Sequence, residues 1–338
     1  MKRVTIKDIA NQLCLSVSTV SRALANDKNI RKETRDKVFE TARKMGYVRN
    51  LVAAILRTGR SNTIGVVVDQ MITPYASKVL QGINKEMRSK GIYVLTYDAD
   101  NDPEVEREYL SMIENSVIDG LIVTQCIHPE NLENLRYLHD KGIPMVFLQS
   151  KVKGIDAPMV GVNSYDKGFF LIDHLVLAGR RRIVNLKGTP LDSVTCDLDR
   201  AYCDVMKKFN LPIVPELQIE GGTDIESGRK IADQLLDSGI EFDGVFAVNE
   251  LEAIGIMNRL MERGKRIPED VAVAAFTGSQ LSEMVHPTLT SVEAPLEDMG
   301  RLAARLLERK IHHPDCRQDV VLVDADIRLR ESTHKKSD

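Results

Sequence analysis

Residues 4–24 read VTIKDIANQLCLSVSTVSRAL, a pattern that predicts two short helices joined by a tight turn. Thr5 can cap the first helix, with Asp8 three residues later as in a capping box. The apolar residues of this helix recur at helical spacing and would form one buried stripe, namely Ile6, Ile9, Ala10 and Leu13. The turn falls near Cys14, and Ser16 can cap the second helix.

A third helix is predicted beyond the polar spacer at residues 26–29. Its inward residues would be Val38, Ala42 and Met45. Three such helices form a helix-turn-helix. The outward face of the second helix would carry Arg22, whose guanidinium can donate two hydrogen bonds to guanine, while the hydroxyls of Ser16 and Ser21 suit phosphate oxygens. This pattern indicates DNA binding, although an ordinary three-helix cap has the same spacing.

The charge of the chain is divided unevenly along its 338 residues. Residues 1–60 hold 14 Lys and Arg against 5 Asp and Glu, a net charge of +9, whereas the remainder holds 32 against 44, a net charge of −12. The length predicts two or more domains. A basic head on an acidic body indicates a nucleic-acid-binding module joined to a domain of another kind.

Several classes of protein are not expected from this composition. No apolar run approaches the roughly 18 residues of a membrane span, and the N-terminus lacks the apolar core of a secretory signal. The five cysteines are scattered without a CxxC pair, which argues against a zinc module or a disulfide framework and suits a reducing cytoplasm. We therefore expect a cytoplasmic protein without a membrane span, a metal or a cofactor.

The head resembles the LacI/GalR family of bacterial repressors. The resemblance rests on an ordered set of motifs, namely Val4–Ala10, Leu15–Leu24, Thr34-Arg35 and Gly46–Asn50. It implies a dimer that binds a pseudo-palindromic operator, with affinity controlled by a small molecule. Two departures matter: Cys14 stands where the family usually has Gly in the turn, and Ala25 stands where it usually has Asn.

The resemblance also implies roles for individual residues of the head, which we take as domain 1–49. The implied base-reading residues are Val17, Ser18 and Arg22. The implied phosphate contacts are Thr5, Ser16, Thr19, Ser21, Asn26 and Thr34.

Residues 50–61 contain a short apolar segment that we interpret as a hinge helix and linker. About two turns of helix are marginal alone in water, so the segment needs a partner. It could pack on the next domain. The resemblance instead implies a helix that enters the DNA minor groove, with Leu56 as an apolar wedge between base steps. The implied minor-groove residues are Asn50, Ala53, Ala54 and Leu56.

The acidic body, residues 62–338, alternates strand-like and helical stretches, which is typical of a parallel sheet. The rhythm repeats, since Asp119-Gly120-Leu121 is echoed by Asp243-Gly244-Val245. We therefore predict two doubly wound α/β subdomains with a cleft at the carboxyl ends of their strands. This matches the periplasmic-binding-protein-like core that the resemblance implies. The predicted N-lobe is about 62–161 and 293–322, and the C-lobe about 162–292 and 323–332.

Loops that follow the core strands would contact the effector in such a core. The resemblance places these contacts at Thr73, Tyr75, Gln125, Gln149, Asn249, Glu250, Phe276 and Thr277. The rings of Tyr75 and Phe276 could stack on a ligand, and the amides of Gln149 and Asn249 suit hydroxyl-rich ligands. Each residue could instead cap a helix or line an empty loop. Thr277 replaces an acidic residue usual in the family. This departure is consistent with an unusual sugar, with a larger and less charged ligand, or with a site that is controlled by a protein or is vestigial.

These observations predict a dimeric, sequence-specific transcription regulator, a repressor whose affinity for operator DNA is controlled by a carbohydrate or a derivative. The alternative is a soluble small-molecule-binding protein whose head does not read DNA. An enzyme is not expected, because the sequence has no P-loop, no GxSxG nucleophile elbow and no HExxH motif. The pair Gly221-Gly222 before a predicted helix could bind an anion, although such a pair is usually a turn.

Overall fold

The computed structural model describes residues 4–24, 27–47, 60–124, 128–152, 154–188, 193–316 and 319–334. These residues divide into two compact units, with the boundary between Ser61 and Asn62. Among the described residues, no helix combines the length and the apolar character needed to cross a membrane. Six of the predicted site residues lie outside the described residues, namely Asn26, Asn50, Ala53, Ala54, Leu56 and Gln125.

The head consists of α1 (Ile6–Leu13), α2 (Val17–Leu24) and α3 (Lys32–Lys44). The capping box at the start of α1 forms as predicted: the Thr5 backbone N–H donates to the Asp8 carboxylate (2.7 Å), and the Asp8 N–H donates to the Thr5 hydroxyl (3.4 Å). The three helices enclose a small core of Ile9, Ala10, Val20, Ala23, Val38 and Ala42. This arrangement leaves the opposite face of α2 exposed.

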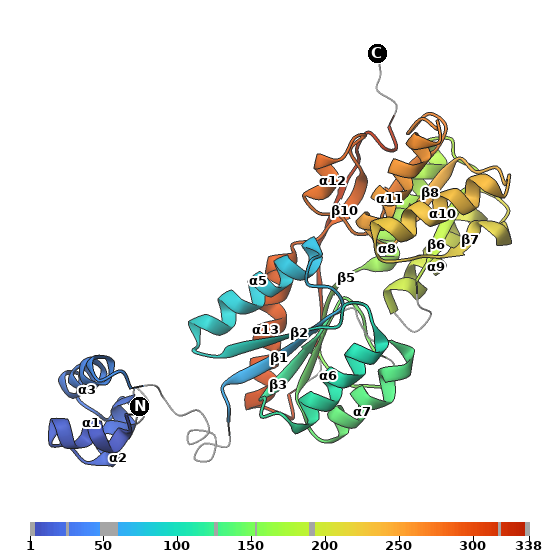
Figure 1. The fold of residues 1–338 in the computed structure, drawn as a ribbon. Coiled ribbons are helices and arrows are strands. Elements are labelled where there is room, and N and C mark those ends of the chain that lie inside the picture. Colours follow the sequence, from blue (N-terminus) through green and yellow to red (C-terminus); the bar gives the residue numbers. More distant parts are fainter. Residues whose placement is uncertain are drawn as a thin grey trace. The chain divides into compact units, whose positions relative to one another are not determined.

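The body contains two six-stranded sheets (Figure 1). The first sheet has the strand order β11-β5-β4-β3-β1-β2, and all its neighbours are parallel. Its strands are β1 (Thr63–Val68), β2 (Tyr93–Asp98), β3 (Gly120–Val123), β4 (Met145–Leu148), β5 (Met159–Val162) and β11 (Val320–Val323). One face packs against α5 (Pro74–Ser89) and α13 (Leu296–His312), and the other against α6 (Pro103–Asn115) and α7 (Leu132–Asp140). Sheet and helices together form the first lobe.

The second sheet has the strand order β12-β10-β9-β8-β6-β7. Its strands are β6 (Ile183–Lys187), β7 (Gln218–Glu220), β8 (Gly244–Ala247), β9 (Ala272–Ala275), β10 (Thr290–Glu293) and β12 (Asp326–Arg328). One face packs against α8 (Ser164–Leu177) and α9 (Ser193–Lys208), and the other against α10 (Ile225–Asp237) and α11 (Glu250–Glu262). This second lobe also holds the short α12 (Leu281–Met284).

The predicted architecture, a helical head and two doubly wound α/β subdomains, is confirmed. One edge strand departs from the parallel pattern, because β12 runs antiparallel to β10. It is separated by only two residues from β11, which belongs to the first sheet.

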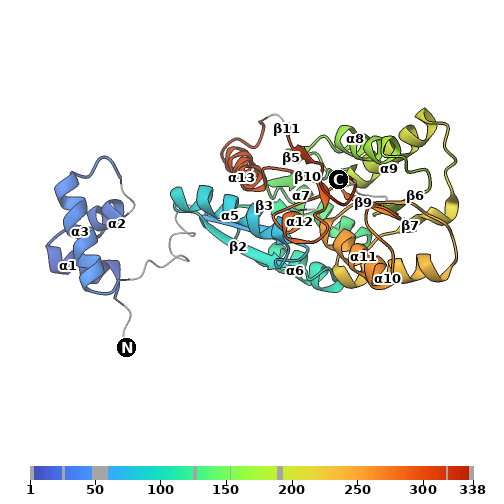
Figure 2. The same ribbon diagram turned by 90° about the horizontal axis from the view of Figure 1, so that it is seen from above.

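Within the described residues, the chain passes between the two sheets three times. It does so after β5, after β10, and between β11 and β12. The strands that lead into these passages lie near the middle of the body in Figure 2. Because both sheets carry helices on both faces, the carboxyl ends of the parallel strands are the natural place for a cleft.

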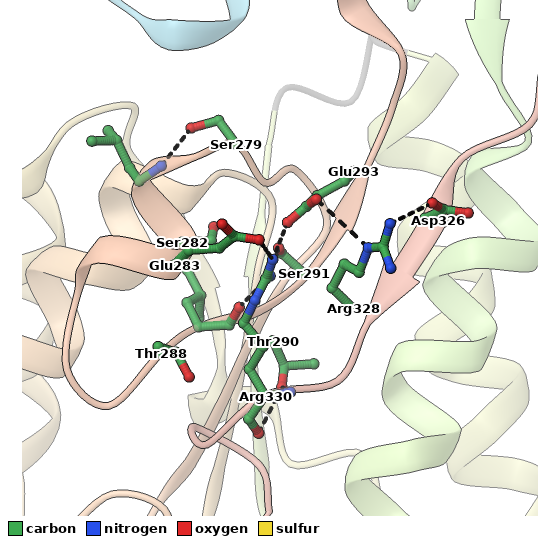
Figure 3. Close-up of polar contacts among 12 residues, drawn as sticks. Ser279, Ser282, Glu283, Thr288, Thr290, Ser291, Glu293, Asp326, Arg328 and Arg330 are labelled. Carbon is green, nitrogen blue, oxygen red and sulfur yellow. Dashed lines mark hydrogen bonds and ion pairs between the residues drawn. The ribbon is translucent and has the colours of Figure 1, made fainter.

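A network around Arg330 fixes the end of the chain beside one of these passages (Figure 3). Its guanidinium donates to the carbonyl oxygen of Leu289 (3.0 Å) and to the hydroxyl of Ser291 (3.1 Å). It also pairs with Glu283 of α12 (3.0 Å) and with Glu293. Glu293 is the last residue of β10, so this one side chain ties the C-terminal segment to α12 and to the passage that follows β10.

Candidate nucleic-acid interface and ligand cleft

The outward face of α2 carries the predicted base-reading residues. Val17, Ser18 and Arg22 are exposed, with Val17 at 45%, whereas Val20 and Ala23 face the core. Among the described residues, no hydrogen bond or ion pair holds the Arg22 guanidinium. On this face, the helix therefore presents the Arg22 guanidinium, which has no partner among the described residues, and the small apolar side chain of Val17.

The predicted phosphate-contact residues surround this face. The Ser16 hydroxyl caps α2 by accepting from the Thr19 backbone N–H (3.0 Å), and it is joined to the hydroxyls of Ser18 and Thr19 (2.8 Å each). Thr19, Ser21 and Thr34 are half-buried. The Thr5 hydroxyl lies 2.7 Å from the Asp8 carboxylate and serves the capping box of α1. Sequence reasoning thus identified residues that also hold the helix starts in place.

Cys14 forms the turn between α1 and α2. It ends α1 in the left-handed region, with φ 52° and ψ 39°. This is the conformation that glycine adopts without strain. The departure from the usual Gly at this position therefore leaves the geometry of the turn unchanged and places a strained residue in it.

A cavity of about 260 Å³ lies between the two lobes, at the carboxyl ends of their strands. Five of the predicted effector contacts line it, namely Thr73, Tyr75, Asn249, Glu250 and Thr277. Gln149 and Phe276 line a smaller cavity of about 30 Å³, which shares Tyr75, Glu250 and Thr277 with the larger one. The structure thus brings seven of the eight predicted residues to the cleft, and Gln125 lies outside the described residues.

Two of these residues act as helix caps. The Thr73 hydroxyl accepts from the Ala76 N–H (3.2 Å) at the start of α5. The Asn249 side chain accepts from the Glu252 N–H (2.9 Å) at the start of α11 and donates to the Gly222 carbonyl (2.9 Å). Because both polar atoms of the Asn249 amide are used inside the protein, its main role here is structural.

Phe276, which was predicted to stack on a ligand, lines only the smaller cavity. Its side chain is 2% exposed and belongs to the core beneath α8 and α9. Ala272, Ala274 and Phe276 share that core, whereas Ala275 faces α10 and α11. Alternation along the strand therefore directs the ring of Phe276 into the lobe. Tyr75 is the predicted ring that remains at the larger cavity.

Glu252 is a cleft residue that sequence reasoning missed. It lines the cavity and is 0% exposed. Its Oε1 accepts from the Gly222 backbone N–H, while its Oε2 has no partner among the described residues. Burial raises the pKa of Glu252 to about 7. No pattern in the sequence marks this residue, since its burial depends on how the loop at Gly221-Gly222 folds over α11.

The Gly221-Gly222 pair lies against the same carboxylate. A side chain at Gly221 would collide with the Glu252 carboxylate.

Asp69 is a second carboxylate that was missed. It directly follows β1, lines the cavity, and has one oxygen, Oδ1, without a partner among the described residues. Burial raises the pKa of Asp69. Its position at a strand end follows the same rule that pointed to Gln149, so the sequence did hold a signal for it.

Hydrogen bonds join the lobes on both sides of the cavity. The Asn101 amide, after β2, donates to the Thr223 hydroxyl (3.2 Å). On the other side, the Lys151 N–H donates to the Ser193 hydroxyl, and the Ser193 N–H donates to the Ser150 hydroxyl (3.0 Å each). The structure is therefore one in which the lobes meet around the cleft.

Comparison with known proteins gives matches for both units. The family described as bacterial regulatory proteins, lacI family, matches residues 5–50, and the periplasmic binding protein-like domain matches residues 172–333. The chain is 26% identical over 330 residues to catabolite control protein A of Staphylococcus xylosus, covering 98% of this chain and 99% of that protein. It is 26% identical over 332 residues to catabolite control protein A of Priestia megaterium, with the same coverage.

Solved structures share the fold over nearly the whole chain. The Lac repressor dimer bound to operator and the anti-inducer ONPF gives a TM-score of 0.83 at 20% identity, covering 98% of this chain and 99% of that one. A complex of the transcriptional regulator CelR with cellobiose gives a TM-score of 0.73 at 23% identity, covering 98% and 100%. At these identities the likeness is one of fold.

Proposed function

This chain belongs to the LacI family of bacterial regulatory proteins, and from this premise we propose that it is a repressor that binds a pseudo-palindromic operator as a homodimer. It is a transcription regulator and not an enzyme. In the proposed organisation, residues 1–49 read DNA, residues 50–61 form the hinge, and residues 62–338 bind effector and dimerise. The protein would act in the cytoplasm, without a cofactor.

The exposed face of α2 carries this proposal. Val17, Ser18 and Arg22 point away from the core of a strongly basic head, which suits insertion into the major groove. Arg22 would read guanine through two hydrogen bonds. The surrounding phosphate contacts would come from Thr5, Ser16, Thr19, Ser21, Asn26 and Thr34. In a dimer, two such heads would occupy major grooves about one helical turn, or a small multiple, apart.

The hinge would add binding in the minor groove. Asn50 would cap the hinge helix, Ala53 and Ala54 are small enough for close approach, and Leu56 would wedge between base steps. Unstacking a step costs roughly a few kcal/mol, which the additional contacts offset. A paired hinge in the dimer would also set the spacing of the two heads.

The cleft would bind the effector. It lies between two lobes joined by three passages of chain, so a ligand that favours one arrangement of the lobes could shift the dimer and its hinge. The structure of CelR with cellobiose supports a sugar as the class of ligand. Within the described residues, the predicted contacts that line the two cavities are Thr73, Tyr75, Gln149, Asn249, Glu250, Phe276 and Thr277.

The first experiment is selection of binding sites from random DNA duplexes by the full-length protein. The wild type should enrich a pseudo-palindrome, and Arg22→Ala should weaken binding to it by about 1–3 kcal/mol while relaxing the preference at one base pair. The double variant Arg22→Ala, Leu56→Ala should lose enrichment. Arg88→Ala, which removes an exposed arginine of α5, is the matched control and should bind as the wild type does.

A selection without enrichment, even after candidate sugars are added, would contradict the proposal. The alternative function, a small-molecule-binding protein whose head does not read DNA, would then be favoured. Salt gives an independent check, because binding through phosphates must weaken as the salt concentration rises.

A further inference from the structure

Three buried side-chain oxygens at the cleft lack a hydrogen-bond donor among the described residues. Asp69 Oδ1 and Glu252 Oε2 line the larger cavity, and Gln149 Oε1 lines the smaller one. None of these three atoms has a partner within the described parts of the chain. A buried acceptor without a donor costs free energy, so a ligand that brings donors would relieve all three.

Glu252 is the most constrained of the three. Its side chain is 0% exposed, and the Gly222 N–H fixes its other oxygen. The loop therefore holds the carboxylate in place, with Oε2 left for the cavity. The nearby charge of Asp224 disfavours ionisation of Glu252 further.

Four carboxylates line the cavity, namely Asp69, Glu220, Glu250 and Glu252, beside the basic residues His128, Lys151 and Lys187. Glu250 is 6% exposed and accepts from the Ser279 N–H and the Ser282 hydroxyl (2.9 Å each), which are neutral donors. His128 is a basic group that acts on Asp69. No ion pair joins Asp69, Glu250 or Glu252 to a base in the described ranges. Within the described ranges, these three carboxylates therefore have no ion-pair partner.

Two lysines also line the cavity, and in the described ranges neither forms an ion pair with these carboxylates. Lys151 is exposed and follows β4. Lys187, at the end of β6, acts on Cys203 of α9.

We propose that the cleft binds a small ligand with a protonated amino group, which Glu252 accepts through Oε2 and Asp69 assists from the opposite lobe. An amino sugar belongs to this class. The inference rests on the proposed function of the cleft as the effector site. An ammonium group offers three donors to several acceptors and also offsets the buried negative charge, whereas a neutral hydroxyl supplies donors alone. A cavity of about 260 Å³ is at the small end of ligand sites.

The test measures binding of matched ligands to the full-length protein by calorimetry at pH 7.5. The amines are glucosamine and galactosamine. The neutral partners are glucose and N-acetylglucosamine for the first, and galactose for the second. At least one amine should bind at least about tenfold more tightly than its neutral partner. Glu252→Gln, which keeps an acceptor for the Gly222 N–H, should weaken the binding of that amine at least about tenfold. Glu220 is an exposed carboxylate at the same cavity. Glu220→Gln should change the affinity for that amine by less than about twofold.

A second measurement needs no ligand. Glu252→Gln removes an uncompensated buried charge, so the unliganded variant should melt about 2–4 °C above the wild type at pH 7.5. A carboxylate with a purely structural role would give no such gain. The proposal is overturned if no amine in the panel binds, if neutral partners bind equally well, or if Glu252→Gln leaves amine binding unchanged.

The two proposals fail separately. Glu252→Gln leaves the head intact, so it should still select the same DNA sequence as the wild type. Amine binding without any DNA sequence preference would contradict the repressor function alone. Sequence-specific DNA binding that responds only to neutral sugars would contradict the amine ligand alone.

Discussion

At the scale of single residues, Cys14 holds a strained backbone conformation in the turn of the head. A left-handed conformation costs a residue with a Cβ atom roughly 1–2 kcal/mol, and Cys14 adopts it between α1 and α2. The turn keeps this geometry because the Leu15 N–H bonds to the Ala10 carbonyl (3.0 Å) and the cores of both helices meet. Packing elsewhere in the head therefore holds a conformation that the residue itself disfavours.

Cys14→Gly should stabilise the head by about 0.5–1 kcal/mol, since glycine removes the strain but gains freedom in the unfolded chain. Hydrogen exchange of α1 and α2 amides in the full-length protein measures this, because it reports opening of the head by itself. Cys14→Ala keeps the Cβ atom and should give no gain. Equal exchange in the Gly and Ala variants would show that the turn is not strained.

Glu106 carries a different cost, that of a buried carboxyl group. It is 0% exposed, and its Oε2 accepts from the His128 N–H (3.0 Å) and the Asn131 amide (2.8 Å). Its Oε1 and the Asn131 Oδ1 have no partner among the described residues. Burial raises the pKa of Glu106 from 4.5 to about 7. The folded state therefore binds more protons than the unfolded state between these values, and its stability falls as the pH rises through this window.

Glu106→Gln should remove the loss of stability that Glu106 causes as the pH rises. The variant is neutral at every pH and supplies a donor beside Asn131. Its advantage over the wild type should grow from near zero at pH 4.5 to about 1–3 kcal/mol at pH 7.5. Urea denaturation at pH 4.5, 6 and 7.5 measures it. Glu108→Gln, on the exposed face of the same helix, should show no such trend, and a constant difference between Glu106→Gln and the wild type would refute the argument.

At the scale of elements, each lobe contains a pair of helices that pack closely because each helix has a glycine at the contact. A methyl group at Gly82 of α5 would overlap the Glu297 carbonyl, and one at Gly300 of α13 would overlap the Val79 carbonyl. In the second lobe, Gly228 of α10 and Gly255 of α11 stand in the same relation to backbone carbonyls. The two lobes thus share the same glycine-mediated helix packing. The repeated pattern of strands and helices in the sequence did not predict this packing.

Gly300→Ala should force α5 and α13 apart. The colliding atom belongs to the backbone and cannot rotate away, so overpacking should cost about 1–3 kcal/mol. Scanning calorimetry of the full-length protein should show a lower Tm. Lys78→Ala, an exposed position of α5, should leave the Tm within about 1 °C. A Gly300→Ala variant as stable as the wild type would mean that the helices are packed less closely than described.

The elements were easier to predict than the site for a physical reason. Helix starts such as Thr5 and strands such as β1 depend on local spacing, which the sequence shows directly. A residue at a strand end faces either the ligand or the core, depending on the side of the sheet to which its side chain points. The burial of Phe276 is an example. Glu252 is harder still, because its role comes from a loop 30 residues away along the chain. Tertiary contact, rather than local pattern, decides the chemistry of the cleft.

At the scale of the whole molecule, the proposed repressor needs a surface that pairs two copies. β2 is the edge strand of the first sheet, and it exposes Tyr93 (61%) and Leu95 (46%). These two residues alternate with Val94, so they share one face of the strand. An exposed edge strand with large apolar side chains is a site for association. A twofold interface would use this strand from both copies.

Leu95→Glu should therefore separate the dimer, because it places two like charges at the twofold interface. Analytical ultracentrifugation should show a monomer at concentrations at which the wild type is a dimer. Operator binding should weaken strongly, since each free head then reaches only one half-site. Leu177→Glu changes an apolar residue of α8 that is 70% exposed, and it should leave both properties unchanged. If Leu95→Glu stays dimeric with full operator affinity, β2 is not the surface through which two copies place their heads on DNA.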